Sequence, residues 1–330
     1  MSQVPFAHLP VMATEVVDLL AAVPPGVVLD ATVGGGGHAA ALLDAAPGLR
    51  IVGLDRDPDA VTAATARLAR FGDRALVVRA RFDALAEVLD GLGSPSLSGA
   101  LFDLGVSSPQ LDRTERGFSY WGDAPLDMRM DPDSGPTAAE LVNTMAERDL
   151  VRLLTENGEG RFARRIVRAL VADRPVLTTA QLASVVRDAI PAAARRHGGH
   201  PARRVFQALR IAVNAELDIL PGALDEAIAR LSPGGRIVVL AYHSGEDRIV
   251  KDRLRVAETG GCTCPPGLPC VCGAVPLVRL LGRRARQPGP AEVAANPRSE
   301  SARLRAAERL AADTRTTDED QITSDERRTP

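Results

Sequence analysis

The sequence predicts an α/β protein built on a mainly parallel sheet, with an all-helical domain inserted into it. Over the first hundred or so residues, short apolar runs typical of strands alternate with helical patterns, and this alternation is typical of parallel sheets with right-handed crossovers. About a hundred residues of helical periodicity then separate the fourth apolar run from the fifth. Such a stretch is far longer than an ordinary connection and indicates an inserted domain.

Each element follows from its own pattern. The expected helices have apolar residues at helical spacing and cover 11–23, 39–45, 59–70, 84–92 and 217–231. The sequence Ser232-Pro233-Gly234-Gly235 predicts a turn that ends the last of them. The expected strands are 27–30, 50–55, 75–78, 100–104, 236–241, 276–281 and 302–306. We therefore expect a discontinuous domain of residues 1–111 and 206–312, an inserted helical domain of residues 112–205, and a disordered polar tail at 313–330.

Size and charge set the limits of the interpretation. A chain of 330 residues, 45% of them hydrophobic, can bury one sizeable core and a smaller second unit. It has no apolar run long enough to span a membrane and no secretory signal, so we expect a cytoplasmic protein. The net charge of −2 is uninformative, but residues 150–210 hold twelve arginines against four acids. Oligomeric state is not predicted.

The most informative stretch is a glycine turn after the first expected strand. Residues 27–30 form an apolar run that ends in Asp30, and Gly34 to Gly37 lead into an alanine-rich helical pattern. Glycines let the backbone approach a ligand closely, and a helix N-terminus offers free N–H groups. Adenosine-containing cofactors are held in this way, but the turn alone does not distinguish NAD from S-adenosylmethionine.

Two further residues fit an adenosine cofactor. Asp55 ends the second expected strand about twenty residues after the turn, where a carboxylate can accept both hydroxyls of a ribose. Phe82 follows the third strand, where its ring could pack on an adenine face or equally belong to the core.

The loop after the fourth expected strand indicates the chemistry. Residues 103–110 read Asp-Leu-Gly-Val-Ser-Ser-Pro-Gln and resemble the Pro-containing loop of amino-group methyltransferases, with Ser108 and Pro109 in the middle. An exocyclic base amine is a poor nucleophile, and hydrogen-bond acceptors on a rigid turn help its nitrogen to pyramidalise. Gln110 replaces the aromatic residue that usually stacks on the base.

Several ordered motifs together resemble one family, the bacterial 16S ribosomal RNA (cytosine-N4) methyltransferases. They are His8-x-Pro10-Val11, Asp30-x-Thr32-x-Gly34-x-Gly36-Gly37-His38, Asp55-Arg56-Asp57, the 103–110 loop, Arg116-Gly117-Phe118-Ser119, 125–131, Phe206-Gln207-Ala208-x-Arg210, His243-Ser244-x-Glu246-Asp247-Arg248 and Asn296-Pro297-Arg298. The resemblance covers residues 8 to 309. One departure is at Tyr242 and Gly245, where the family usually has Phe and Leu.

This resemblance implies a class I (Rossmann-like) S-adenosylmethionine-dependent methyltransferase that acts on N4 of a decoding-centre cytosine in 16S ribosomal RNA of the small subunit. It implies that the cofactor is surrounded by Gly36, Gly37, His38, Asp55, Phe82, Asp103 and Gln110. The expected catalytic residues are Ser108, Pro109 and His243. As a lone histidine, His243 could accept a proton, orient the base or be purely structural.

The arginines of the insert are candidates for RNA contact. Arg161, Arg164, Arg165 and Arg168 share one face of a predicted helix, and such a stripe either neutralises phosphates or is simply solvated. Given the local excess of arginine we expect RNA contact through Arg164, Arg165, Arg168, Arg195, Arg196, Arg203 and Arg204.

All four cysteines lie in one short segment, as Cys262, Cys264, Cys270 and Cys272. Two Cys-x-Cys pairs joined by a Pro- and Gly-rich loop could hold a structural zinc ion, although reduced thiols without metal remain an alternative. In a cytoplasmic chain, metal is favoured over a disulfide.

Three other functions stay open from the residues alone. They are methylation of an amino group in DNA or another RNA, NAD-dependent oxidoreduction, and RNA binding without catalysis. The 103–110 loop and the long insert disfavour the oxidoreductase.

Overall fold

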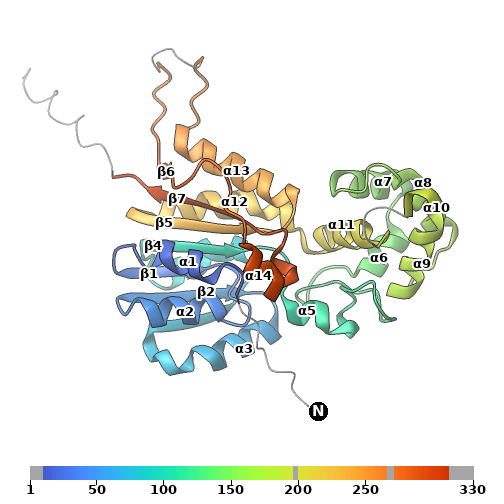
Figure 1. Ribbon diagram of the computed structural model, residues 1–330, viewed down its shortest axis with the longest axis horizontal. Coiled ribbons are helices and arrows are strands. Elements are labelled where there is room, and N and C mark those ends of the chain that lie inside the picture. The colour runs from blue at the N-terminus through green and yellow to red at the C-terminus, as the bar shows by residue number, and fades with distance from the viewer. Residues whose placement is uncertain (1–9, 196–199, 266–270, 312–330) are drawn as a thin grey trace, which may run out of the picture.

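A seven-stranded sheet forms the centre of the larger domain (Figure 1). The computed structural model describes residues 10–195, 200–265 and 271–311. The strand order is β3-β2-β1-β4-β5-β7-β6; β1 to β5 pair in parallel, and β7 is antiparallel to both its neighbours. The strands are β1 (Gly26–Asp30), β2 (Leu49–Asp55), β3 (Ala75–Arg79), β4 (Leu97–Asp103), β5 (Leu231–Ala241), β6 (Val278–Leu280) and β7 (Arg303–Arg309). All seven strands predicted from the sequence are confirmed.

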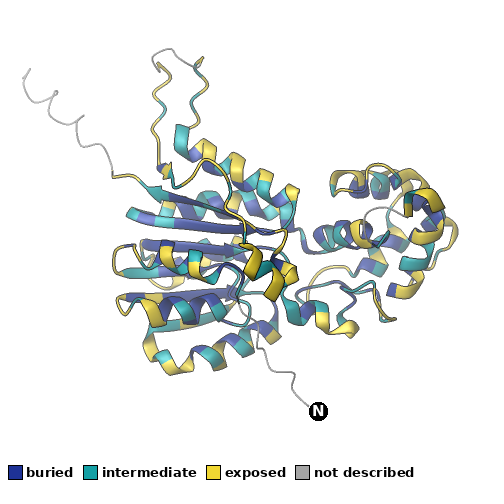
Figure 2. Ribbon diagram, in the orientation of Figure 1, coloured by how far each residue is buried: buried dark blue, intermediate teal, exposed yellow. Residues whose placement is uncertain are grey.

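Helices cover both faces of this sheet, as the parallel strands require. One face carries α1 (Ala13–Leu20), α2 (Gly37–Ala45) and α3 (Pro58–Leu68), and the other carries α4 (Leu85–Gly91), α12 (Glu216–Arg230) and α13 (Ser244–Thr259). Their inward leucines are buried in two separate apolar clusters, while their outer faces are exposed (Figure 2). The sheet therefore has a core on each side, and its carboxyl edge is left for the loops.

The inserted domain is all-helical and has a core of its own. Its helices are α6 (Ala138–Thr144), α7 (Glu147–Glu156), α8 (Ala163–Ala172), α9 (Thr179–Ala189), α10 (Ala192–Arg195) and α11 (Arg203–Asn214). The boundary expected between Val205 and Phe206 falls inside α11, and both side chains are buried in the helical core. Helical periodicity shows that a segment is amphipathic, but not which core its apolar face joins.

The predicted turn at 232–235 is part of β5. Pairing with β4 slips between Leu97 and Gly99, because the Pro-Gly-Gly segment makes a bulge in the longer strand. Gly234 has φ +77°, and a Cβ at Gly235 would lie 2.9 Å from the Leu97 carbonyl oxygen. Only glycine fits this close approach of two backbones.

Within the described residues, no helix is both long and apolar enough to cross a lipid bilayer. The expected disordered tail at 313–330 lies outside the described residues.

Candidate active site

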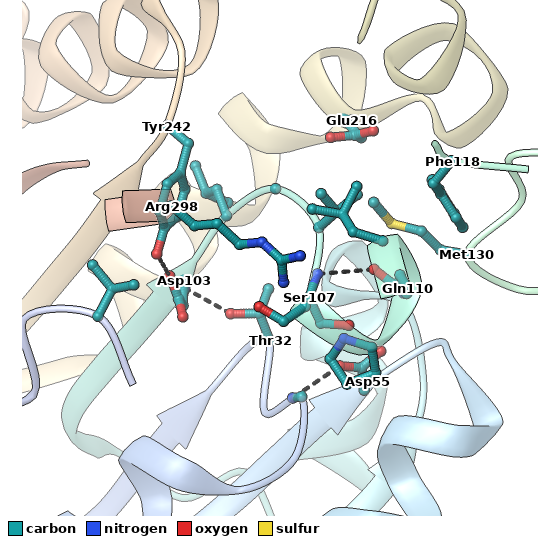
Figure 3. Close-up of a pocket in the computed structure, with 18 of the residues that line it drawn as sticks. Thr32, Asp55, Asp103, Ser107, Gln110, Phe118, Met130, Glu216, Tyr242 and Arg298 are labelled. Carbon is teal, nitrogen blue, oxygen red and sulfur yellow. Dashed lines mark hydrogen bonds between the residues drawn. The ribbon is translucent and has the colours of Figure 1, made fainter. Parts of the chain in front are cut away.

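A cavity of about 620 Å³ lies at the carboxyl edge of the sheet. The loops after β1, β2, β3, β4 and β5 form one side, and residues of the helical domain form the other (Figure 3). Six of the seven residues predicted to surround the cofactor line it: Gly37, His38, Asp55, Phe82, Asp103 and Gln110.

The glycine turn connects β1 to α2 through left-handed backbone conformations. Gly34 has φ +51° and Gly36 has φ +74°. The Gly34 N–H donates to Asp55 Oδ2 at 2.9 Å, which ties the turn to the end of β2. Gly36 does not line the cavity; a Cβ there would lie 3.3 Å from Ala64 Cα on α3. Its role is to let the turn pack on α3, rather than to contact a ligand directly.

Asp55 lies at the end of β2, facing the cavity. Backbone N–H groups bond both carboxylate oxygens at 2.9 Å, Gly34 to Oδ2 and Asp57 to Oδ1. Burial raises the pKa of Asp55 to about 6. Each oxygen keeps a second lone pair, so the carboxylate is oriented and can accept two hydroxyl groups from a ligand.

Two neighbouring side chains show that the residues present fit S-adenosylmethionine. His38 is 6% exposed, and neither of its ring nitrogens has a hydrogen-bond partner. Its Nε2 lies 3.6 Å from Asp103 Oδ2 on the cavity wall. Phe82 is buried edge-on against Phe102 while also lining the cavity, so it serves the core and offers an apolar contact. A cavity that is lined both by buried polar atoms without partners and by an apolar ring matches an adenosine with charged groups.

Asp103, at the end of β4, is held by residues that follow the two neighbouring strands, β1 and β5. Its N–H donates to Thr32 Oγ1 at 2.7 Å, and the Tyr242 hydroxyl donates to Asp103 Oδ1 at 2.7 Å (Figure 3). Burial, reinforced by Asp103, raises the pKa of Tyr242 well above its ordinary range. The tyrosine therefore remains a donor, and it leaves Asp103 Oδ2 directed toward His38.

The predicted amine-binding loop is the start of a short helix, α5 (Ser108–Asp112). Ser107, Ser108 and Pro109 line the cavity. Gln110 is buried; its Oε1 accepts from the Ser107 N–H at 3.0 Å, and its Nε2 donates to Asp57 Oδ2 at 2.8 Å. Since both ends of its amide are bonded to protein, Gln110 fixes the loop to the segment that follows Asp55.

His243 caps α13 and lines the cavity. Its Nδ1 accepts from the N–H groups of Gly245 and Glu246, at 3.2 and 3.4 Å. The proton of the neutral ring therefore resides on Nε2, which lies 3.1 Å from Glu246 Oε1 without forming a hydrogen bond. This tautomer can donate a hydrogen bond but cannot accept a proton at Nε2, so it favours an orienting or structural role.

Aromatic and apolar residues of the helical domain face the cofactor residues across the cavity. They are Phe118, Tyr120, Met130 and Phe206. Sequence reasoning assigned none of them to the site, although Phe118 belongs to the Arg116–Ser119 motif. Gly117 has φ +75°, and a Cβ there would lie 2.5 Å from the Pro125 carbonyl oxygen, so this glycine permits the fold that presents Phe118. These side chains give the cavity an apolar wall opposite the residues predicted to hold the cofactor.

The arginines divide into two groups. Arg164, Arg165 and Arg168 are exposed on α8 and do not line the cavity. Arg203 is exposed on α11 and lines it, whereas Arg204 and Arg195 are exposed elsewhere on the helical domain. Arg196 lies outside the described residues. Arg67, Arg81 and Arg298 also line the cavity, and Arg298 projects into it while bonding Asp112 at 2.6 Å (Figure 3).

Three of the four cysteines are brought together away from the cavity. The Sγ atoms of Cys262, Cys264 and Cys272 lie within 4.8 Å of one another. Cys270, the fourth candidate ligand, lies outside the described residues.

The fold and the cavity define a class of protein. A glycine turn after the first strand, an acid after the second, and a Ser-Pro loop after the fourth meet at one edge of a sheet whose last strand, β7, is antiparallel. This combination is that of a class I methyltransferase.

The similarity of this chain to known proteins identifies its family. The model of the MraW methylase family matches residues 5–310, and the chain belongs to that family. Relatives named ribosomal RNA small subunit methyltransferase H include one from Thermobifida fusca, 55% identical over 92% of this chain and 93% of its own length. Another, from Mycobacterium sp. (strain KMS), is 53% identical over 92% of this chain and 84% of its own length. A solved putative rRNA-methylase from Clostridium thermocellum is 13% identical, with a TM-score of 0.43 over 92% of this chain and all of its own.

The protein is accordingly a methyltransferase that uses S-adenosylmethionine. Family membership removes the oxidoreductase and the RNA-binding protein without catalysis from the alternatives.

Proposed function

We propose that this methyltransferase modifies the N4 amino group of a cytosine in 16S ribosomal RNA of the small subunit. The observation that carries the proposal is the hydrogen bond between Gln110 and Asp57. It joins the Ser-Pro loop to the segment after Asp55, so the proposed amine-binding and ribose-binding groups line one cavity. The relatives' name supports ribosomal RNA of the small subunit as the substrate.

S-adenosylmethionine would be held by Asp55, by His38 and Asp103, and by the backbone at Gly37, with Phe82 against its base. When bound, it supplies a methyl group on a positively charged sulfur. The chain's own task is to place the cytosine nitrogen in line with that methyl group, since orientation alone removes much of the barrier.

The cytosine ring would lie between the Ser107–Gln110 segment and the aromatic wall of the helical domain. Phe118, Tyr120 and Phe206 give that ring apolar surfaces. Oxygens of the segment at Ser108 and Pro109 would accept hydrogen bonds from the amino group, so its nitrogen pyramidalises toward the methyl carbon. His243, with its proton on Nε2, would orient the base from the other side as a hydrogen-bond donor.

The helical domain, residues 112–214 with α11 included, would recognise the RNA around one extruded base. Arg203 and Arg298 at the cavity would neutralise the nearest phosphates. The exposed α8 arginines would meet phosphates further away. Their distance from the cavity makes them accessory contacts rather than part of the chemistry.

The test maps methyl groups on 16S ribosomal RNA by mass spectrometry, in cells with and without this gene. We expect one N4-methylated cytosine to lose its mass increment in the deletion strain and to regain it on complementation. Complementation with Asp55→Ala should fail to restore the methyl group, because methylation depends on a residue of this cavity. A methyl group lost from another base, or no loss at all, would contradict the proposal. Methylation of a DNA duplex by the purified protein in place of small-subunit RNA would favour the DNA alternative.

A further inference from the structure

We propose that Cys262, Cys264 and Cys272 form a structural zinc site that closes the long hairpin between α13 and β6. Cys262 and Cys272 come from the two arms of this hairpin, ten residues apart in the chain. Their Sγ atoms are 3.6 Å apart, and all three sulfurs lie within 4.8 Å of one another. Sulfurs bound at about 2.3 Å in a zinc tetrahedron lie about 3.8 Å apart. The cluster therefore has the dimensions of a thiolate cage.

The same distance argues against a disulfide. Bonded sulfurs lie about 2.05 Å apart, well below the separation of Cys262 and Cys272. Cys264 is close to both at the same time, and three convergent thiols suit a metal ion better than any single covalent pair. Divalent zinc would also compensate the negative charges that deprotonated thiols bring together.

The hairpin needs such a crosslink because it has no core. Among the described residues from Gly261 to Leu277, not one is buried, and Val271 and Val275 are 88% and 69% exposed. Its base is fixed, since the Leu277 N–H donates to the Ala257 carbonyl at 2.8 Å and the Gly260 backbone lies against Val275. Beyond this base, in the described part of the hairpin, Cys262 and Cys272 bring the two arms close together. Segments without enough apolar burial are commonly stabilised by a metal.

The site is structural rather than catalytic. Among the described residues that line the cavity, none falls between Glu246 and Pro297, so the cysteine cluster takes no part in the active site. In Figure 1 the hairpin extends from α13 and β6 on the side of the sheet away from the helical domain. Zinc loss should therefore change the hairpin and leave cofactor binding intact.

Metal content tests the proposal directly. Full-length protein purified under reducing conditions, without chelators, should contain one zinc ion per chain by plasma mass spectrometry. Replacement of zinc by Co²⁺ should give thiolate-to-cobalt charge-transfer bands and the visible bands of tetrahedral cobalt. Protein with less than a tenth of an equivalent of zinc that also fails to bind added Zn²⁺ or Co²⁺ would overturn the proposal.

Substitutions distinguish loss of the zinc ligands from a general disturbance of the hairpin. Cys264→Ser and Cys272→Ser should each lose zinc at least tenfold and become more sensitive to limited proteolysis within 261–277. Val271→Ser is the matched control, because it alters an exposed side chain of the same hairpin and should retain zinc. All three should bind S-adenosylmethionine like the unaltered protein, which also proves that they are folded. Retention of zinc in both serine variants, or equal zinc loss in Val271→Ser, would refute the site.

Discussion

The Tyr242 hydroxyl donates a 2.7 Å hydrogen bond to Asp103 Oδ1 across 139 positions of the chain. Tyr242 follows β5 and Asp103 ends β4, so the bond joins two neighbouring strands at the edge of the cavity. It fixes one oxygen of Asp103 and leaves the other facing His38. A Phe at this position would have no hydroxyl group to make this bond.

Tyr242→Phe should therefore leave the fold intact and make the orientation of the Asp103 carboxylate less fixed. Loss of one such bond should lower the free energy of unfolding by about 1 kcal/mol. It should also weaken the binding of S-adenosylmethionine several-fold, because the carboxylate is no longer held in one orientation. Denaturant unfolding and titration calorimetry measure the two effects. If neither quantity changes, the bond does not orient the acid.

Asp55→Ala should weaken the binding of S-adenosylmethionine while the protein remains folded. Removal of the carboxylate leaves buried ribose hydroxyls without an acceptor, at a cost of roughly 1–3 kcal/mol. Calorimetric titration against the cofactor checks this. Arg148→Gln, which changes a side chain that is 88% exposed on α7, is the control and should bind normally. Equal affinities in the two variants would rule Asp55 out of the cofactor site.

Cofactor affinity should also fall in mild acid. Burial raises the pKa of Asp55 from 3.8 to about 6, so the carboxylate is ionised above that pH and protonated below it. We therefore expect ribose binding to be strongest well above pH 6 and to decline as the pH drops through 6. The effect on folding has the opposite sign: this group favours the folded state at low pH, and the contribution disappears as the pH rises from about 4 to about 6.

Dissociation constants measured between about pH 5 and about pH 8 test this dependence. Asp30 is also buried, with its pKa raised to about 7, and it is the competing source of any pH effect. Asp55→Asn should bind weakly at every pH. A pH dependence that survives in Asp55→Asn but disappears in Asp30→Asn would assign the effect to Asp30 instead.

Gln110→Ala should reduce turnover more than cofactor affinity. The change removes the acceptor of the Ser107 N–H and one of the partners of Asp57 Oδ2, so the Ser-Pro loop loses its link to the segment after Asp55. A displacement of about 1 Å can cost on the order of a hundredfold in rate. Pro109→Ala, which frees the backbone of the same loop, should act in the same direction. Single-turnover rates with saturating cofactor separate chemistry from binding, and full rates in both variants would place the amine elsewhere.

The arginines should differ in what they contribute to RNA binding. Replacing Arg164, Arg165 and Arg168 by Gln should weaken RNA binding and make the RNA affinity less dependent on salt concentration, because fewer counterions are released. Arg203→Gln should also lower the methylation rate, since Arg203 lines the cavity. Salt titrations of RNA affinity measure the first effect, with Arg148→Gln as control. An unaltered salt dependence in the triple variant would make the α8 stripe a solvated surface.

Local patterns predicted the sheet and several of the strand-end residues that line the cavity. The glycine turn, Asp55 and Asp103 each follow directly from a strand, and the ends of parallel strands must meet at one edge. The substrate side could not be predicted in this way. Whether Phe118 or Phe206 faces the cavity depends on how the helical domain packs against the sheet, and no local pattern encodes this.

Dependence on tertiary packing also explains why local patterns missed the domain boundary and the contacts of Gln110. The apolar face of α11 is visible in the sequence, but its burial in the helical core depends on tertiary packing. Gln110 was expected to contact the cofactor, and it lines the cavity. Its amide is bonded to Ser107, three residues before it, and to Asp57, which only folding brings near.

The insertion of β7 between β5 and β6 has a consequence for the order of events during synthesis. The segment just before β7 contributes Pro297, Arg298 and Ser301 to the cavity, and Glu292 bonds the Met12 backbone at 2.6 Å. A nascent chain that has already displayed its glycine turn, Asp55 and Ser-Pro loop still lacks one wall of the pocket. We therefore expect the pocket to gain its full lining, and its ability to retain a methyl donor, only after residues 297–301 have been made and β7 has joined the sheet.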